Sequence, residues 1–211
     1  MNKPKIIIGI DPDVKKSGFA VLDVDAKEIV QVEALSFPDL ILMLNRICID
    51  NRLEFGQPKL FGVQIVIEDS DDTTNWHLPA GVNTRAAAAI GHNVGLCHAT
   101  QRHIQEWAVN LGFDVKLTKP LKKEWMGRDG KITQEEIMQF IPGLPKKMNQ
   151  ECRDAALLAW NEAGLPIRIP ASFYQKRFSM ENLKHDTLKE FKEKTKKEGE
   201  FLLRAGLRKT K

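Results

Sequence analysis

The feature that most constrains this chain is a run of four isoleucines and one glycine at positions 6–10, which ends directly at Asp11. A continuous apolar run of this kind is typical of a strand that is buried on both faces of a sheet. Such a strand requires helices on both sides of the sheet, and a chain of 211 residues is long enough to supply them. The sequence therefore predicts an α/β protein whose first buried strand ends in a carboxylate.

The rest of the chain alternates between predicted strands and predicted helices. Short β-branched or alternating segments predict strands at 18–24, 29–35, 63–67 and 113–117, and helical spacing of apolar residues predicts helices at 38–51, 83–111 and 150–163. Thr133 with Glu136 has the pattern of a capping box, and Asn149 can cap the last helix. The first three strands are joined by short connections, so we expect an antiparallel meander, then parallel strands, in a mixed five-stranded sheet with helices on both faces.

Charge divides the chain into two parts. Residues 1–164 carry a net charge of −3 and residues 165–211 a net charge of +7, which together give the chain its +4. We expect a folded domain over 1–164 and, over 165–211, a basic linker followed by a helical C-terminal tail. A basic tail is typical of a protein with a polyanionic partner, nucleic acid or a membrane surface, and also of a solvated helix that aids solubility.

The cysteines and the hydropathy pattern indicate a cytoplasmic protein. Three cysteines at wide spacings predict neither a disulfide framework nor a zinc module, which favours reduced thiols. No apolar run reaches the ~20 residues that span a bilayer, and the first residues lack the pattern of a signal peptide. We therefore expect no membrane partner.

Four acidic residues stand at positions that suggest a common site. Asp11 and Glu68 each end an apolar strand, and Glu151 and Asp154 lie three apart on one predicted helix, where they share a face. Ligand sites in α/β sheets form at the carboxyl ends of strands. Four carboxylates in one place repel one another unless cations neutralise them, and carboxylate oxygens suit Mg²⁺ or Mn²⁺. Two such ions are the usual apparatus for hydrolysis of a phosphodiester.

Each of these acids also has a purely structural explanation. Asp11 followed by proline can start a turn, and Glu68 begins an acidic stretch that is typical of a solvated loop. Glu151 and Asp154 lie in the first turns of a helix, where the helix dipole favours acidic residues. The joint occurrence of two strand-terminal acids favours the functional interpretation.

Several segments resemble the RuvC-type Holliday junction resolvases of the RNase H-like superfamily. They are IGIDPDVKKSGFAVLD (8–23), IVIEDS (65–70), NTRAAAAIGHNVGLCHA (83–99) and ITQEEIMQFIPGLPKKMNQECRDAALLAWNEA (132–163). Their order and spacing carry the resemblance, which covers residues 5–164. The resemblance implies an RNase H-like fold for this part of the chain.

The resemblance also implies a set of metal ligands. They would be Asp11, Glu68 and Asp154, with Glu151 in the fourth place, holding two Mg²⁺ ions for which Mn²⁺ can substitute. The implied catalytic group is the same set, with Asp11 bridging the two ions. Where the family usually has glycine, this chain has Asp13, so we expect Asp13 to adopt the backbone geometry of a glycine.

The implied activity is the resolution of four-way DNA junctions by a homodimer, through two-metal hydrolysis that leaves 5′-phosphate and 3′-hydroxyl ends. Three alternatives remain: another RNase H-like nuclease acting on RNA–DNA hybrids or on branched or flap DNA, a non-catalytic DNA-binding relative, and an ATPase of the sugar-kinase or actin type. The last requires a second glycine-rich phosphate loop, which the sequence does not contain.

Basic residues beyond the acidic group are candidates for DNA contacts. The segment 115–131 holds six basic and two acidic side chains, and contacts of this kind bind phosphates without reading the base sequence. Trp76 follows Glu68 in a polar loop, where it would stack on an unpaired base or anchor the loop, and Trp125 is a weaker candidate of the same kind. The predicted DNA-binding residues are Trp76, Lys116, Lys119, Lys122, Lys123, Arg128, Lys131, Lys146 and Lys147. An exposed basic loop without a DNA partner is the alternative.

Small residues recur at four-residue spacing in the predicted helix 83–111, at Ala87, Gly91, Gly95 and Ala99. They allow another backbone to approach closely, which favours packing within the domain, with a dimer contact as the alternative.

Overall fold

The computed structural model describes residues 4–55, 62–69, 81, 83–121 and 124–174. The chain divides into two compact units, 1–168 and 169–211. In the second unit, the described residues form a helical turn at 171–174, in which the Phe173 amide donates to the Pro170 carbonyl at 2.9 Å. The predicted helical tail and the residues Trp76, Lys122 and Lys123 lie outside the described residues.

The strands and helices of the first unit follow the predicted order, which is confirmed within a few residues at each end. The elements are β1 (Ile6–Asp11), β2 (Ser17–Asp23), β3 (Glu28–Leu35), α1 (Phe37–Phe55), β4 (Val63–Glu68), α2 (Thr84–Asn110), β5 (Asp114–Thr118), α3 (Gln134–Ile137) and α4 (Gln150–Glu162). A short 3₁₀ helix, η2 (Arg128–Gly130), was not predicted from the sequence. None of the helices in the described ranges is long and apolar enough to cross a membrane.

The five strands form one mixed sheet in the order β3-β2-β1-β4-β5. β2 pairs antiparallel with both β1 and β3, whereas β4 pairs parallel with β1 and β5. This arrangement is the RNase H-like α/β fold, so the predicted fold class is confirmed for the described part of the chain. β1 and β4 lie side by side and point the same way, so their carboxyl ends meet at one edge of the sheet.

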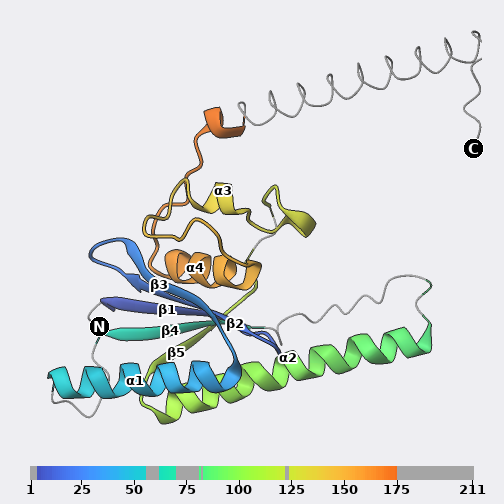
Figure 1. The fold of residues 1–211 in the computed structure, drawn as a ribbon, viewed down its shortest axis with the longest axis horizontal. Coiled ribbons are helices and arrows are strands. Elements are labelled where there is room, and N and C mark those ends of the chain that lie inside the picture. Colours follow the sequence, from blue (N-terminus) through green and yellow to red (C-terminus); the bar gives the residue numbers. More distant parts are fainter. Residues whose placement is uncertain (1–3, 56–61, 70–80, 82, 122–123, 175–211) are drawn as a thin grey trace, which may run out of the picture. The chain divides into compact units, whose positions relative to one another are not determined.

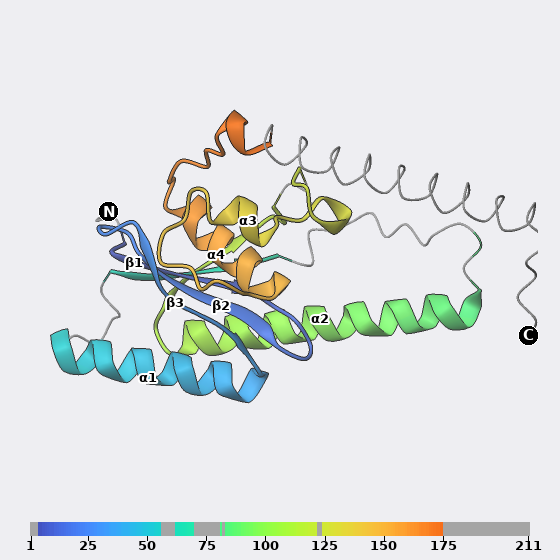
Figure 2. The ribbon, with the colours of Figure 1, turned by 45° about the horizontal axis from the view of Figure 1, so that its top comes forward.

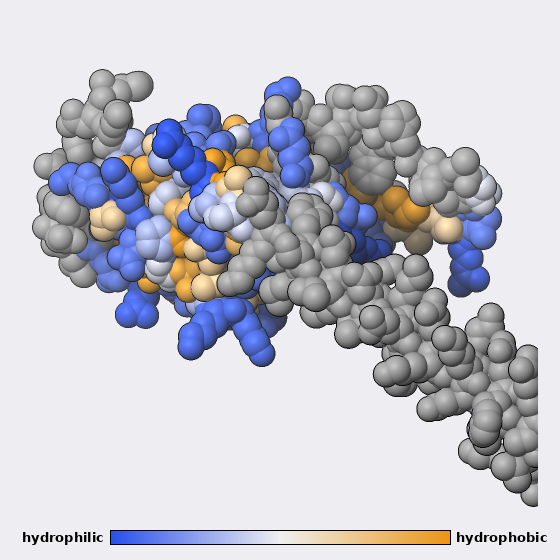
Figure 3. All heavy atoms as spheres, turned by 90° about the horizontal axis from the view of Figure 1, so that it is seen from above, coloured by the Kyte–Doolittle hydropathy of each residue, from blue (hydrophilic) through white to orange (hydrophobic). Residues whose placement is uncertain are grey.

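The sheet separates two hydrophobic cores (Figures 1 and 2). On one face, Ile8 and Ile10 of β1 pack with residues of α1 and α2, including Leu44 and Ile104. On the other face, Ile7 packs with α4 and with the segment that contains α3. Seen from the side of α4, hydrophobic residues reach the surface between hydrophilic ones (Figure 3). The central strands are therefore buried on both faces, as the isoleucine run predicts.

Side-chain caps fix where the helices begin. The Asn83 side chain accepts from the Ala86 amide at 2.9 Å, and Asn149 accepts from the Cys152 amide at the same distance. Thr133 and Glu136 form the predicted capping box at the start of α3. The start of α4 is thus set by Asn149, which places Glu151 and Asp154 in its first turns.

Two glycines let α4 lie directly against the sheet. A Cβ atom at Gly9 would collide with the Ala155 carbonyl of α4, and a Cβ atom at Gly18 would collide with the Glu151 carbonyl. Only residues without a side chain permit this approach of helix backbone to strand backbone. The position of α4 over β1 and β2 therefore depends on Gly9 and Gly18.

The first half of α2 is exposed, in contrast to the packing within the domain that its small residues favour. No atom of another described segment lies within 4 Å of the place where a Cβ of Gly91 or Gly95 would be. The buried residues of α2, Gln101, Ile104 and Ala108, all lie in its second half. Close packing of the small residues within the domain is thus wrong for Gly91 and Gly95, because α2 extends past the part of the sheet that it covers (Figure 2).

The glycine contacts give a stability prediction. We expect Gly18→Ala to lower the free energy of unfolding by about 1–3 kcal/mol, because the added methyl group displaces the α4 backbone. Urea denaturation followed by circular dichroism measures the change. Gly91→Ala is the matched control, and we expect it to stabilise the chain by about 0.5–1 kcal/mol, because alanine favours an exposed helix. Equal effects of the two variants would contradict this account of the α4 contact.

Candidate active site

Two strand ends bring Asp11 and Glu68 together. Ile10 of β1 is paired with Ile67 of β4 in parallel register, so Asp11 and Glu68 are the next residues on neighbouring strands. Ile10 and Ile67 face the core with α1 and α2. Because side chains alternate along a strand, Asp11 and Glu68 face the opposite side, where α4 lies. Both are partly buried.

The first turns of α4 bring two more carboxylates to the same edge. The Glu151 carbonyl lies against Gly18, and Gly18 is paired with Asp11 across β1 and β2. Asp154 follows one helical turn after Glu151, on the same face of α4. The four acidic residues predicted from the sequence are thus gathered around the end of β1.

The charges of this group act on Asp11 most strongly. Burial raises the pKa of the Asp11 carboxyl well above its usual range. Repulsion from the carboxylates of Glu68 and Asp154, and more weakly from Glu151, raises this pKa further. Among the described residues, Lys131 alone lowers this pKa. Such a cluster is unfavourable when every member is ionised and no cation is near.

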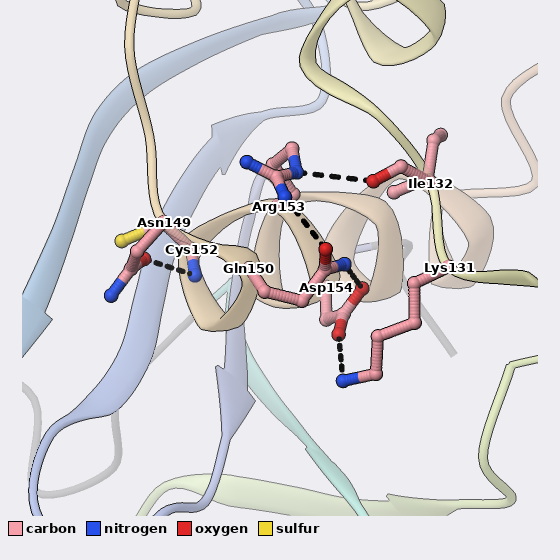
Figure 4. Close-up of polar contacts among 7 residues, drawn as sticks. All are labelled: Lys131, Ile132, Asn149, Gln150, Cys152, Arg153 and Asp154. Atoms are coloured by element: carbon pink, nitrogen blue, oxygen red, sulfur yellow. Dashed lines mark hydrogen bonds and ion pairs between the residues drawn. The ribbon is translucent and has the colours of Figure 1, made fainter. Parts of the chain in front are cut away.

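Lys131 brings a positive charge into the carboxylate group. Its Nζ lies 3.0 Å from Oδ2 of Asp154 (Figure 4). Burial lowers the pKa of Lys131, but attraction to the Asp154 carboxylate, joined by Asp11 and Glu68, raises this pKa above its usual range overall. The ammonium group therefore stays charged and offsets part of the negative charge of the site.

A compact turn carries Lys131 to this position. The amide of Gly127 donates to the Lys131 carbonyl at 2.9 Å, and the Trp125 amide donates to the Gly130 carbonyl at 3.0 Å. The fully buried Glu136 carboxylate accepts from the amides of Met126 and Thr133, at 3.1 and 3.0 Å. The turn is therefore held by its own backbone hydrogen bonds and by the Glu136 side chain of α3. The basic composition of the segment 115–131 predicts Lys131 as a phosphate contact only; its place beside Asp154 is not predicted from the sequence.

The second carboxylate oxygen of Asp154 accepts a hydrogen bond from a side chain of α4. The Gln150 side-chain amide donates to Oδ1 of Asp154 at 2.8 Å, and Arg153 Nη2 donates to Oε1 of Gln150 at 2.6 Å. Both oxygens of Asp154 thus have a donor, Gln150 on one side and Lys131 on the other (Figure 4). The spacings Gln150–Arg153 and Gln150–Asp154, three and four residues on a helix, are a sequence signal that could have identified these contacts.

The side chains of the acidic group have the chemistry of ligands for a hard divalent cation. Asp11, Glu68, Glu151 and Asp154 supply carboxylate oxygens, which are the ligands that Mg²⁺ prefers, and the Lys131 ammonium is already a cation among them. Within the described ranges, no three His, Cys, Asp or Glu side chains stand close enough together to enclose a metal ion. The geometry is that of an acidic group whose positive charge comes from Lys131.

The predicted DNA-binding residues in the described part of the chain are mostly exposed, and some of them form ion pairs. Lys116 pairs with Glu162 at the end of α4, with Nζ 2.8 Å from Oε1. The Arg128 side chain is 95% exposed in the turn that carries Lys131, 3.6 Å from Asp129. Lys146 and Lys147 are exposed just before α4, and Lys119 is exposed after β5. The exposed cations therefore lie in the segments that lead to and from the acidic edge.

Two loop residues, Trp125 and Asp13, have defined contacts, and Asp13 differs from the sequence prediction. Trp125 stacks on Phe140, with ring centroids 6.2 Å apart, and packs against the core that contains α4. Asp13 is not among the residues with positive φ; instead its Oδ1 accepts from the Lys15 amide at 2.8 Å. The expectation of glycine geometry at Asp13 is therefore wrong, because the side chain stabilises an ordinary turn.

Two solved structures are similar to this chain. They are RuvC from Thermus thermophilus, alone and in complex with a Holliday junction substrate, each with a TM-score of 0.42 and 14% sequence identity, covering 75% of this chain and 96% of the other. No protein-family model and no curated protein sequence matches the chain.

The charge cluster predicts that Asp11 weakens the fold in the absence of divalent cations. A raised carboxyl pKa means that ionisation is disfavoured in the folded state, so the penalty grows as the pH rises above the usual carboxyl range. We expect Asp11→Asn, measured in EDTA, to have a higher urea midpoint than wild type at about pH 8, and the difference to shrink towards about pH 4.

Asp50→Asn is the control for this measurement. Asp50 lies on α1 with its side chain 68% exposed, paired with Arg46, and its loss should change stability little at either pH. A midpoint of Asp11→Asn below that of wild type at the higher pH would show that the carboxylate contributes to folding.

Proposed function

We propose that this chain is a metal-dependent endonuclease that cleaves branched DNA, with the four-way junction as its preferred substrate. The observation that supports this proposal is the grouping of four carboxylates around the end of β1, where burial, and then repulsion from the other three, raises the pKa of Asp11. A fold gains no stability from such a group. Its usefulness lies in binding divalent cations.

Asp11, Glu68 and Asp154 would hold the cations, with Glu151 in the fourth place. Mg²⁺, for which Mn²⁺ can substitute, would activate a water for attack on phosphorus and stabilise the leaving 3′ oxygen, which yields 5′-phosphate and 3′-hydroxyl ends. Asp11, on the strand next to Glu68 and near Asp154, would be a ligand of these cations. Lys131 offsets negative charge at the same edge and is available to a phosphate oxygen of the substrate.

The sequence segments that resemble RuvC-type resolvases favour branched DNA over other nucleic acids. The acidic pair on α4, Glu151 and Asp154, and the preceding GLP segment at 143–145 are part of that resemblance. A nuclease for RNA–DNA hybrids and a non-catalytic DNA-binding protein are the remaining alternatives. The presence of all four acids argues against the non-catalytic one.

The DNA would be held by cations around the acidic edge. Arg128, Lys146 and Lys147 are exposed in the described part of the chain, and contacts of this kind position the phosphates. We also propose that residues 1–164 form the nuclease domain and that the basic tail, 165–211, adds affinity for DNA. Because a junction has two strands to cut, two copies of the chain would act as a symmetric dimer.

A panel of labelled substrates tests the activity. In Mg²⁺ or Mn²⁺, we expect wild type to cleave a four-way junction faster than a flap, an RNA–DNA hybrid or a plain duplex, and EDTA to abolish cleavage. We expect Asp11→Asn to slow cleavage by about a thousandfold or more, because divalent cations supply several kcal/mol of transition-state stabilisation. Junction affinity in Ca²⁺ should stay near that of wild type, with two chains bound per junction.

Asp50→Asn is again the control, and it should cleave as wild type does. Faster cleavage of the RNA–DNA hybrid than of the four-way junction would contradict the proposed substrate. Cleavage by Asp11→Asn at the wild-type rate would overturn the assignment of the active site.

The tail prediction concerns the salt dependence of binding. Deleting residues 165–211 removes a net charge of +7, so we expect weaker junction binding and a shallower decline of log affinity with log salt concentration, because fewer counterions are released. Fluorescence anisotropy at several KCl concentrations measures both. An unchanged salt slope in a folded truncation would show that the tail does not contact DNA.

A further inference from the structure

We propose that Arg153, which is not itself a candidate metal ligand, is the positioning residue of this site. Its guanidinium orients Asp154 through Gln150, and it holds Lys131 beside Asp154 through Ile132. This inference rests on the proposed function for its meaning. Its geometry does not depend on that function, because every contact involved lies within the chain (Figure 4).

Three hydrogen bonds of one guanidinium connect three segments. Nε donates to the Ile132 carbonyl at 3.1 Å, Nη1 donates to the Met148 carbonyl at 2.6 Å, and Nη2 donates to Oε1 of Gln150 at 2.6 Å. Ile132 follows the turn that carries Lys131, and Met148 lies just before α4. Arg153 thus ties both segments to the first turn of the helix that presents Asp154.

The first branch determines how Gln150 is oriented. Its side-chain oxygen accepts from Arg153, so its nitrogen must point the other way, and this nitrogen donates to Oδ1 of Asp154 at 2.8 Å. A carboxylate only accepts hydrogen bonds, so the reversed amide would bring two oxygens together. By selecting one orientation of Gln150, Arg153 selects the orientation of Asp154.

The second branch determines where Lys131 lies. The Ile132 carbonyl, bonded to Arg153, fixes the backbone next to Lys131, and Ile132 itself is buried with 1% exposure. From there the Lys131 ammonium reaches Oδ2 of Asp154 at 3.0 Å. The two oxygens of Asp154 are therefore reached by two donors, and the position of each donor is set by the same guanidinium.

An arginine is suited to this role by its shape. The guanidinium is planar and carries five donors in fixed directions, which lets it bond three acceptors at once. A lysine keeps the charge but not this geometry. Loss of the residues that orient a ligand typically lowers metal affinity by about 10–100-fold. We therefore expect the two sets of contacts made by Arg153 to affect the affinity of Asp154 for a cation.

The first test needs neither metal nor DNA. Limited reductive dimethylation in EDTA, followed by peptide mass spectrometry, gives the labelling rate of each lysine. We expect Arg153→Met and Arg153→Lys to speed the labelling of Lys131 up to about fivefold, the factor that corresponds to loss of an ion pair of this partly exposed kind. Lys116, in a comparable ion pair with Glu162 at 2.8 Å, is the internal control and should keep its rate.

The second test is a double-mutant cycle on Mn²⁺ binding, measured by titration calorimetry without DNA. We expect Gln150→Ala and Arg153→Met each to weaken Mn²⁺ binding about tenfold. The double variant should bind no more weakly than Arg153→Met alone, because Gln150 acts on Asp154 only in the orientation that Arg153 sets. Arg46→Met, which removes an exposed arginine of α1, should change neither measurement.

Unchanged labelling of Lys131 in both folded Arg153 variants, or additive losses in the cycle, would overturn the inference. If Arg153→Met fails to fold, Arg153→Lys takes its place in both measurements, with the same expected results. A wild-type chain that neither binds Mn²⁺ nor cleaves DNA would contradict the proposed function, and the labelling rates would still decide whether Arg153 positions Lys131.

Discussion

The contact between the α4 backbone and the two central glycines determines where the acidic residues lie. Because Gly9 and Gly18 carry no side chain, carbonyl groups of α4 pack directly against the backbone of the strands. The first turns of α4 therefore lie next to the end of β1, where the charges of Glu151 and Asp154 raise the pKa of Asp11. A larger residue at either glycine would separate the helix acids from the strand acids.

This closeness creates electrostatic repulsion, which Lys131 and the hydrogen bonds around Asp154 offset in part. The carboxylates repel one another, and burial weakens the screening that water would give. Lys131 supplies a positive charge, delivered by a turn that the buried Glu136 holds in place. Asp154 is also bonded by Gln150. The ion pair and the hydrogen bond therefore fix the orientation of the Asp154 carboxylate within the chain itself.

Much of this arrangement could be predicted from the sequence, and the exceptions have physical reasons. The isoleucine run and the capping residues predict the sheet and the helix starts, because burial and capping are local signals. Strand ends and helix spacing likewise predict which acids converge. The place of Lys131 could not be predicted, since it depends on a turn closed by Glu136. Nor could the exposure of Gly91, because sequence spacing is the same for an open face as for a packed one.

The second half of α2 is anchored at Gln101, whose buried side chain donates to Oδ1 of Asp69 at 3.2 Å. Asp69 in turn donates from its amide to the Thr118 carbonyl of β5 at 2.7 Å. The helix is thereby clamped to the sheet next to Glu68, whereas its earlier turns are free of that constraint. Substitutions in the outer part of α2 therefore leave the contacts of Gln101 and Asp69 at the sheet in place.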